Sequence, residues 1–241
     1  MDTVTLFVPC LMDAFRPEAA EAVVAVFEGL GYAVHCPAEQ TCCGQPAFNA
    51  GYRNEARTAA RRFLRLFGDA EAICCPSGSC VAMVRHHVPA LFDGEPDWRA
   101  LAVRTAARTF EFTEYLVDVL GRDDLGASFP ARVTYHDSCH LLRGLGIREQ
   151  PRRLLRRVRG LELVEMKNSD CCCGFGGAFS VKYPDISTAL VADKVEWIRE
   201  SGAEAVVGAD LGCLLHIEGA LRRKGLGVRA LHIAQVLAGG R

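Results

Sequence analysis

One internal repeat limits the folds of this chain more than any other feature. Three segments of the first half recur, in the same order, in the second half. The paired segments are VTLFVPC (4–10) with VTYHDSC (133–139), CCGQPAFNAGY (42–52) with CCGFGGAFSVKY (172–183), and AEAICCPSGSC (70–80) with AEAVVGADLGC (203–213). A fourth match pairs two short helical segments, 112–120 and 232–240. Ordered self-similarity indicates two copies of one unit, which we place at 1–125 and 131–241.

Each copy alternates runs typical of strands with amphipathic runs typical of helices. Strands are expected at 4–8, 32–36, 72–75, 132–136, 161–166 and 205–207, and helices at 18–30, 54–67, 152–158 and 186–201. This alternation predicts a parallel sheet with helices on both faces. The fold class is therefore α/β: two tandem, pseudo-symmetric copies of a small parallel-sheet unit. The first copy is longer near 87–99, where a lid, a partner surface or a tolerated loop would fit.

Composition and the first residues exclude several classes. The 28 basic and 29 acidic side chains nearly cancel, which argues against a nucleic-acid partner. The opening residues MDTVTLFVPC lack the cationic start of a signal peptide. No stretch approaches the roughly 18 apolar residues of a membrane span. We therefore expect a cytoplasmic protein with no membrane span.

Cysteine is unusually frequent, with 12 residues in the chain. Several are neighbours in sequence, at 42–43, 74–75 and 171–173. A disulfide between sequence neighbours is strained, so these runs argue against a disulfide framework. In a cytoplasmic chain, such a density of thiols points to metal or redox chemistry.

Alignment of the two copies separates the recurrent cysteines from the others. Four recur in each copy, namely Cys10, Cys42, Cys43 and Cys80, and Cys139, Cys172, Cys173 and Cys213. All eight lie at the carboxyl ends of predicted strands or just after them, where open α/β sheets bind ligands. Gly44 and Gly174 follow the paired cysteines and permit the tight turn that lets two consecutive thiolates face one centre. We predict that these eight cysteines bind a metal cofactor.

The donor set suits two kinds of metal centre. Four thiolates can hold an iron–sulfur cluster or a tetrahedral zinc ion. A zinc ribbon usually draws its ligands from two short knuckles, whereas these ligands come from three separate loops and include a vicinal pair. This arrangement favours a multi-iron centre. Zinc in one or both copies, and free redox thiols, remain alternatives.

Together these segments resemble the CCG cysteine-rich domain proteins, which include components of heterodisulfide reductase and of glycolate oxidase that carry iron–sulfur centres. The resemblance to the lactate utilization protein A family is closer. It rests on CCGQPAFNAGY, PSGSC, HDSC, CCGFGGAFSVK, GADLGCLL and HIAQVL, which span the chain. It implies one part of a cytoplasmic system that oxidises L-lactate to pyruvate. It also implies one or two iron–sulfur clusters, of the [4Fe-4S] type, that pass electrons to other iron–sulfur subunits; binding of a small 2-hydroxy acid stays open.

The chain departs from the heterodisulfide reductase pattern at the end of each copy. Copies of that type end in C-x-x-C and supply five thiolates to a non-cubane cluster. Here the first copy has Cys75 and Cys80 with four residues between them, and the second copy has only Cys213. A five-cysteine centre is therefore not expected, although Cys75 could be an extra ligand. The simplest interpretation of Cys36, Cys74, Cys75 and Cys171 is a small buried apolar residue.

Two further functions stay open as alternatives: one component of a heterodisulfide or thiol redox enzyme, and a structural zinc protein without a redox role. No catalytic residue is assigned. The glycine-rich segment 174–177 lacks the spacing of a phosphate-binding loop.

Histidine and arginine supply secondary candidates. His136 and His140 flank Cys139 and could hydrogen-bond a cluster sulfur, or they could be satisfied polar residues at a strand end. His216 follows Cys213 by one helical turn and could face the same centre, whereas His86 and His87 look like a surface pair. Seven arginines between 143 and 159 form either a docking patch for an acidic partner or a solvated helix face: Arg143, Arg148, Arg152, Arg153, Arg156, Arg157 and Arg159. Arg143, which is nearest to Cys139, is also a candidate for contact with a substrate carboxylate.

Overall fold

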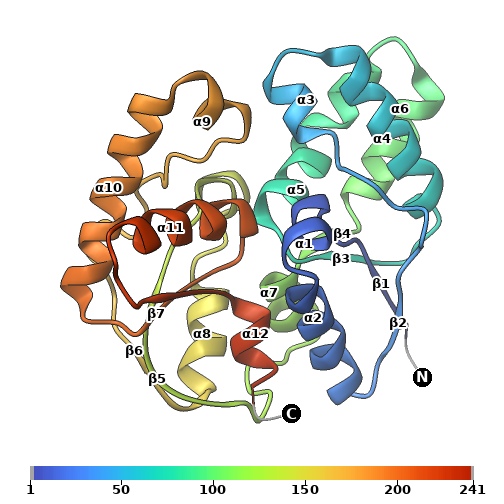
Figure 1. Cartoon of the computed structure of the whole chain (residues 1–241). Helices are drawn as coiled ribbons and strands as arrows, with labels where there is room; N and C mark the ends of the chain where they lie inside the picture. The colour runs from blue at the N-terminus through green and yellow to red at the C-terminus, as the bar shows by residue number, and fades with distance from the viewer. Residues whose placement is uncertain (1–2, 240–241) are drawn as a thin grey trace. The chain divides into compact units, whose positions relative to one another are not determined.

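The computed structural model describes residues 3–239 as two compact units, Met1–Tyr115 and Leu116–Arg241 (Figure 1). Each unit contains a parallel sheet of four strands with helices packed around it. Two parallel sheets in tandem confirm the predicted α/β class. The domain limits 1–125 and 131–241 remain predictions. Within the described residues, no helix combines the length and the apolar character that crossing a bilayer requires.

The sheet of the first unit has the order β2-β1-β3-β4. Its strands are β1 (Thr3–Leu6), β2 (Ala33–His35), β3 (Ile73–Cys75) and β4 (Thr109–Glu111). The helices are α1 (Cys10–Phe15), α2 (Pro17–Gly29), α3 (Gln45–Asn49), α4 (Arg53–Phe67), α5 (Gly78–Ala82), α6 (Pro96–Ala106) and α7 (Phe112–Glu114). A π-helical turn, Met83–His87, and a 3₁₀ turn, Pro89–Phe92, connect α5 to α6.

The sheet of the second unit repeats this order as β6-β5-β7-β8. Its strands are β5 (Ser128–Tyr135), β6 (Arg159–Leu163), β7 (Ala205–Gly208) and β8 (Arg229–His232). The helices are α8 (Glu149–Arg157), α9 (Ala178–Lys182), α10 (Pro184–Ser201), α11 (Leu211–Arg223) and α12 (Ile233–Leu237). Two π-helical turns, Tyr115–Val119 and His140–Gly144, complete the elements.

Apolar residues at helical spacing fix how the helices pack. Helix α4 is rich in arginine, yet its buried positions form one stripe that ends in Phe63, Leu64 and Phe67. Phe7, just after β1, meets that stripe with ring centroids 4.9 Å from Phe63 and 5.4 Å from Phe67. In the second unit, α10 and α11 lie against the sheet and bury Val195 and Ile217 in one core (Figure 1). The central strands β3 and β7 are buried along their whole length, as strands of a parallel sheet covered by helices are.

The structure adds a fourth strand to each copy, where the sequence indicated three. Strand β4 ends directly before the helical segment expected at 112–120. Strand β8 ends at His232, the first residue of the segment expected at 232–240, of which residue 240 lies outside the described residues. At three and four residues, they are too short for periodicity to identify.

The extra segment near 87–99 is a packed helical element. Its Phe92 and Trp98 rings stack 5.7 Å apart, and Glu95 pairs with Arg61 of α4. The ion pair ties the segment to α4.

Candidate metal-binding sites

The first unit brings its four recurrent cysteines to the carboxyl edge of the sheet. Cys10 begins α1 just after β1, and Cys80 lies in α5 just after β3. The pair Cys42 and Cys43 occupies the loop between β2 and α3. Loops that follow parallel strands meet at one edge of a sheet, so three distant segments converge there.

The sulfur atoms of this first group are in contact in pairs. The Sγ atoms of Cys10 and Cys42 lie 3.6 Å apart, and those of Cys43 and Cys80 lie 3.4 Å apart. The backbone N–H of Gly44 donates to the Sγ of Cys42 at 3.4 Å. Cys43 and Cys80 are buried, while Cys10 and Cys42 are half-buried. The group is therefore a thiol cluster with one protected side and one side open to the surface.

Hydrogen bonds between these thiols shift their pKa values in opposite directions. Hydrogen bonds from Cys10 and Cys43 lower the pKa of Cys42 to about 3, against the opposing effect of burial. The pKa of Cys10 rises because its thiol bonds to Cys42, and that of Cys43 rises because its thiol bonds to Cys42 and Cys80. The thiolate form is the nucleophile and the metal ligand. Cys42 is therefore the first thiol of the group to be available as a thiolate.

The second unit repeats this placement. Cys139 follows β5, Cys213 lies in α11 just after β7, and Cys172 and Cys173 occupy the loop between β6 and α9. The Sγ atoms of Cys173 and Cys213 lie within 4.8 Å of each other, and the Cys139 and Cys172 thiols are close enough to shift each other's pKa. The N–H of Gly174 donates to the Sγ of Cys172 at 3.3 Å, as Gly44 does in the first unit. The duplicated sequence has thus produced a second thiol cluster with the same pairing.

The thiols of the second group are also graded in acidity. Hydrogen bonds from Cys139 and Cys173 lower the pKa of Cys172 to about 2. The Cys173 thiol lowers the pKa of Cys213 to about 7, helped by the His136 ring and opposed by burial. The pKa of Cys139 and that of Cys173 rise because their thiols bond to Cys172.

Gly174 supports the turn that aims both thiols of the second pair. Its φ is +85°, and a Cβ atom there would lie 2.6 Å from the carbonyl oxygen of Ser187. Gly174→Ala is therefore expected to lower the free energy of unfolding by about 1–3 kcal/mol. Urea unfolding measures this change. Gly219→Ala is the matched control, because Gly219 has open space around it, and equal midpoints for the two variants would contradict the prediction.

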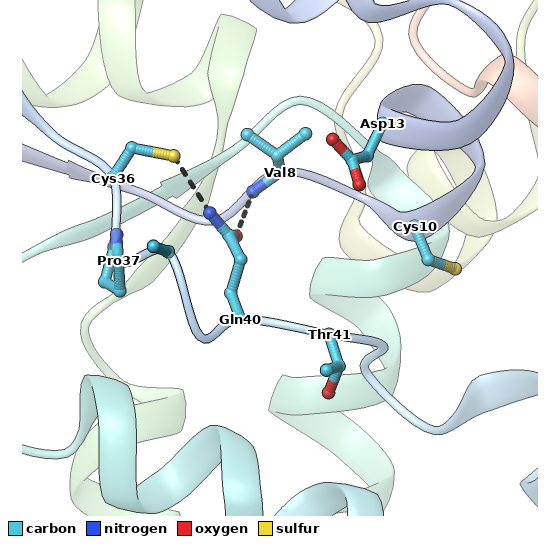
Figure 2. Close-up of a pocket in the computed structure, with 8 residues that line it drawn as sticks. Val8, Cys10, Asp13, Cys36, Pro37, Gln40 and Thr41 are labelled. Atoms are coloured by element: carbon cyan, nitrogen blue, oxygen red, sulfur yellow. Dashed lines mark hydrogen bonds between the residues drawn. The ribbon is translucent and has the colours of Figure 1, made fainter.

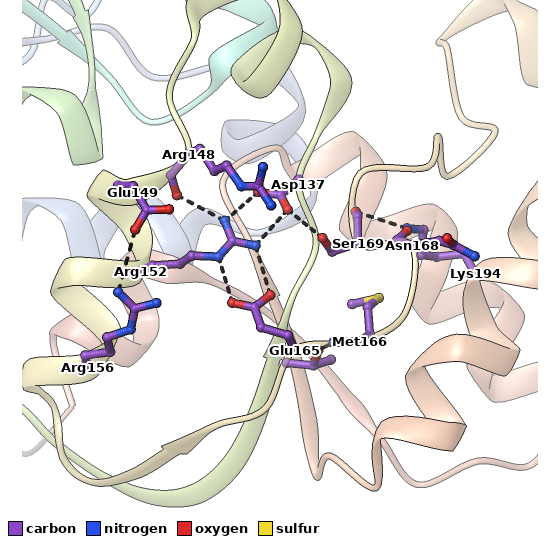
Figure 3. Close-up of polar contacts among 11 residues, drawn as sticks. Asp137, Arg148, Glu149, Arg152, Arg156, Glu165, Met166, Asn168, Ser169 and Lys194 are labelled. Carbon is purple, nitrogen blue, oxygen red and sulfur yellow. Dashed lines mark hydrogen bonds and ion pairs between the residues drawn. The ribbon is translucent and has the colours of Figure 1, made fainter.

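An ion network centred on the buried Arg152 involves residues that shortly precede the thiols of the second unit in the chain (Figure 3). Arg152 of α8 donates to both carboxylate oxygens of Asp137 at 2.8 Å, and to Glu165 at 2.7 and 2.9 Å. Asp137 also accepts from the hydroxyl of Ser169 at 2.8 Å. Burial alone would raise the pKa of Asp137, but the hydrogen bonds from Arg152 and Ser169 outweigh it and lower that pKa.

This network joins the two loops that carry thiols. Asp137 lies two residues before Cys139, and Ser169 lies three residues before Cys172. The ammonium of the buried Lys194 donates to the backbone carbonyls of Asn168 at 2.8 Å and Ser169 at 3.1 Å. Sequence reasoning missed Asp137, Glu165 and Lys194. An acidic residue directly after a buried strand was the available signal.

Apolar residues stand at the same positions of the first unit. The aligned segments place Phe7 opposite His136 and Val8 opposite Asp137. Phe7 packs on aromatic rings, and the N–H of Val8 donates to the amide oxygen of Gln40 at 2.7 Å. The two thiol clusters therefore share their cysteines but differ in the residues beneath them.

A cavity of about 380 Å³ opens beside Cys10 (Figure 2). Its lining residues are Val8, Cys10, Asp13, Cys36, Pro37, Ala38, Gln40 and Thr41. Asp13 is the one charged side chain in this lining. The Gln40 amide is held in place by Val8 and by the thiol of Cys36, which lies 2.9 Å from Nε2 (Figure 2). The cavity thus carries negative charge and no cationic group.

The four remaining cysteines fall into different environments. Cys74 and Cys75 are fully buried in β3, which agrees with the role of small apolar residues. Burial raises the pKa of Cys75, and a hydrogen bond with Cys80 adds to this effect, so Cys75 borders the first cluster. Cys171 is half-buried. Cys36 is exposed, and its interpretation as a buried residue was wrong, because β2 is an edge strand.

The candidate histidines separate in the same way. His136 is 1% exposed, and one of its nitrogens lies with the sulfurs of Cys173 and Cys213 in a group whose ligand atoms are all within 4.8 Å of one another. His140 places Nδ1 at 3.6 Å from the Sγ of Cys139. His216 contacts the hydroxyl of Ser187 at 3.2 Å, and His87 stacks on Phe48 with centroids 4.5 Å apart.

The arginines between 143 and 159 do not form one uniform patch. Arg152 is buried, and Arg153 pairs with Asp123 at 3.0 Å. Arg156 lies 3.6 Å from Glu149, and Arg159 donates to a backbone carbonyl at 3.3 Å. Arg143 likewise donates to the backbone of Asp170, at 3.0 Å, and so braces the loop before Cys171. Most of these side chains therefore contact other residues of the second unit.

Comparison with known proteins agrees with the duplicated architecture. The family model described as a cysteine-rich domain, CCG, matches residues 4–85 and again residues 133–218. Lactate utilization protein A of Geobacillus kaustophilus (strain HTA426) is 50% identical over 234 residues, which cover 97% of this chain and 98% of that protein. Lactate utilization protein A of Exiguobacterium sp. (strain ATCC BAA-1283 / AT1b) is 50% identical over 242 residues, covering 100% of this chain and 98% of that protein.

A solved structure supports the fold alone. The crystal structure of a hypothetical protein from Helicobacter pylori superposes with a TM-score of 0.69 at 11% sequence identity. It covers 100% of this chain, which spans 49% of that one. The 50% identity to the curated relatives extends over nearly the whole chain and shows the family. This chain belongs to the lactate utilization protein A family and contains two CCG cysteine-rich domains.

Proposed function

We propose that this protein takes part in lactate utilization as an iron–sulfur electron-transfer component of a cytoplasmic system that oxidises L-lactate, or a related 2-hydroxy acid, to pyruvate. The names of its relatives support the pathway. The observation that carries the redox role is the gathering of four thiols at the carboxyl edge of each sheet. The proposed ligands are Cys10, Cys42, Cys43 and Cys80, and Cys139, Cys172, Cys173 and Cys213.

The donor chemistry of both groups fits an iron–sulfur centre. Thiolates are the usual ligands of [4Fe-4S] clusters, and each unit offers four from three loops. A cluster bound there would supply one-electron transfer. The N–H groups of Gly44 and Gly174 point at sulfur atoms, and hydrogen bonds to sulfur tune the potential of such centres. The buried Cys43 and Cys173 close the inner side of each site to water. The buried Cys75 is a candidate for an additional ligand in the first unit.

The cavity beside Cys10 argues that lactate is oxidised on a partner. A 2-hydroxy acid carries a carboxylate, and proteins usually bind carboxylates with arginine or other donors. The lining of this cavity offers the carboxylate of Asp13 instead. We therefore assign the two-electron step to another component of the system, with this chain relaying electrons.

A set of exposed apolar side chains that follows the second pair of thiols in the chain suits a redox partner. Val181, Tyr183 and Ile186, on α9 and the start of α10, are 81%, 54% and 54% exposed. Exposed apolar side chains that gather into a patch are typical of interaction surfaces. We propose that another iron–sulfur protein of the system contacts this surface, which follows Cys172 and Cys173 in the chain.

Structural zinc in the second unit is the second candidate, favoured by the mixed group of His136, Cys173 and Cys213. Zinc commonly takes combinations of cysteine and histidine. This assignment would limit the redox role to the first unit.

Metal analysis of anaerobically purified protein tests the proposal. Iron with matching sulfide, at about four or eight per chain, is expected for one or two [4Fe-4S] clusters. The reduced sample should also give an EPR signal. Zinc alone, without sulfide and without an EPR signal, would contradict electron transfer and leave a structural metalloprotein.

A further inference from the structure

We infer that His136 is a direct metal ligand in the second unit and takes the place of one of the four thiolates proposed there, so that the two centres of the chain differ: the first is bound by sulfur alone and the second by sulfur and one imidazole nitrogen. This inference rests on the proposed presence of a metal centre at each thiol cluster. It goes further by naming a donor that the first unit does not have.

The first step is the burial of a ring whose nitrogens lack ordinary partners. His136 is 1% exposed, and neither Nδ1 nor Nε2 has a partner at hydrogen-bond distance among the residues that the structure describes. The Cys213 thiol is the protein group with which the ring interacts. Buried polar atoms in proteins are almost always satisfied, because an unmade hydrogen bond costs the full desolvation of the group. That thiol can satisfy at most one of the two nitrogens, so the ring still requires a partner that protein atoms do not supply. A metal ion is such a partner.

The second step is distance. A nitrogen of His136 and the Sγ atoms of Cys173 and Cys213 all lie within 4.8 Å of one another. Ligands that share one tetrahedral ion are about 3.5–3.8 Å apart, given metal–sulfur bonds of about 2.3 Å and metal–nitrogen bonds of about 2.0 Å. The three atoms therefore come within a small adjustment of a shared coordination sphere. His136 directly follows the carboxyl end of β5, and Cys213 lies in the first turn of α11.

The third step is the contrast between the copies. The position equivalent to His136 holds Phe7, which is 1% exposed and packed edge-on against Phe63 and Phe67. The site in the fold therefore accepts an aromatic hydrocarbon without any polar contact. The second unit instead has an imidazole of similar shape, turned toward two sulfurs. Packing accounts for a ring at this position, but it does not account for the two nitrogens.

The experiment uses the whole protein labelled with ¹⁵N-histidine and its unlabelled counterpart. Pulsed EPR of the reduced protein should show a strong nitrogen coupling that changes with the label, and if the second centre is zinc, zinc K-edge absorption should show a nitrogen neighbour among the sulfurs. In His136→Phe the nitrogen signal should vanish, and chelators should remove metal from the second centre at least about tenfold more readily. His140→Phe is the control, because His140 lies beside Cys139 but is not in the group of His136.

The outcomes separate this inference from the proposed function. Metal in both units, with no directly bonded nitrogen in the wild-type protein, would overturn the role of His136 and leave electron transfer standing. A weak coupling, typical of a hydrogen bond to sulfur, would overturn it as well. Absence of metal from both units would refute both. Since the wild-type measurement needs no variant, the test holds even if His136→Phe fails to fold.

Discussion

Serine in place of Cys10 is expected to remove the metal centre of the first unit and to leave that of the second unit intact. The hydroxyl is a poor ligand for the soft metals that thiolates hold, and it leaves Cys42 without the sulfur that lies 3.6 Å away. Metal analysis should show a loss of about half of the bound metal if both units are filled alike. Cys139→Ser should remove the other half.

Cys36→Ser is the control for these two variants. Cys36 is an exposed thiol that belongs to neither cluster, so its replacement should leave the metal content unchanged. Loss of all metal from Cys10→Ser alone would show that the two clusters form one shared centre. Unchanged metal content in Cys10→Ser would show that Cys10 is not a ligand.

Replacing Arg152 with methionine is expected to lower the free energy of unfolding by about 3–5 kcal/mol, because removal of one partner leaves a buried carboxylate unpaired. Arg152 is 4% exposed in its side chain and Asp137 is 1% exposed, so water cannot replace the lost contacts. Chemical denaturation measures the change. Arg153→Met on the same helix is the matched control: its pair with Asp123 is exposed, and its loss should cost at most about 1 kcal/mol.

A double variant tests whether the loss comes from the unpaired charge. Asp137→Asn in the Arg152→Met background removes the unpaired carboxylate and should recover part of the free energy of unfolding. The effects of the two substitutions should therefore be non-additive, as is usual for residues in contact. Equal destabilisation by Arg152→Met and Arg153→Met would show that the buried network stabilises the fold no more than an exposed ion pair does. Arg152→Met should also loosen metal binding in the second unit only, because the network joins the two loops of that unit, whereas Arg153→Met should leave metal binding unchanged.

The repeat made much of this architecture predictable. A parallel sheet follows from alternating strands and helices, and the carboxyl ends of its strands are the one place where Cys10, Cys42 and Cys80 can meet. Strand β4 escaped prediction because Thr109–Glu111 is a three-residue element defined by its pairing with β3 rather than by its own pattern. Sequence spacing likewise gave no reason to bury Lys194 or Arg152. Their burial depends on carbonyl and carboxylate groups from distant segments.

The convergence of three loops on each cluster also bears on how the protein is assembled. Cys10 and Cys42 are 32 residues apart in the chain, and Cys43 and Cys80 are 37 apart. Closing loops of that length in an unfolded chain costs about 3 kcal/mol or more in entropy for each loop. Once the sheet has formed, that entropy is already lost and the thiols are neighbours. Cofactor insertion is therefore expected to follow folding of each domain, so that maturation acts on a finished scaffold rather than on a nascent chain.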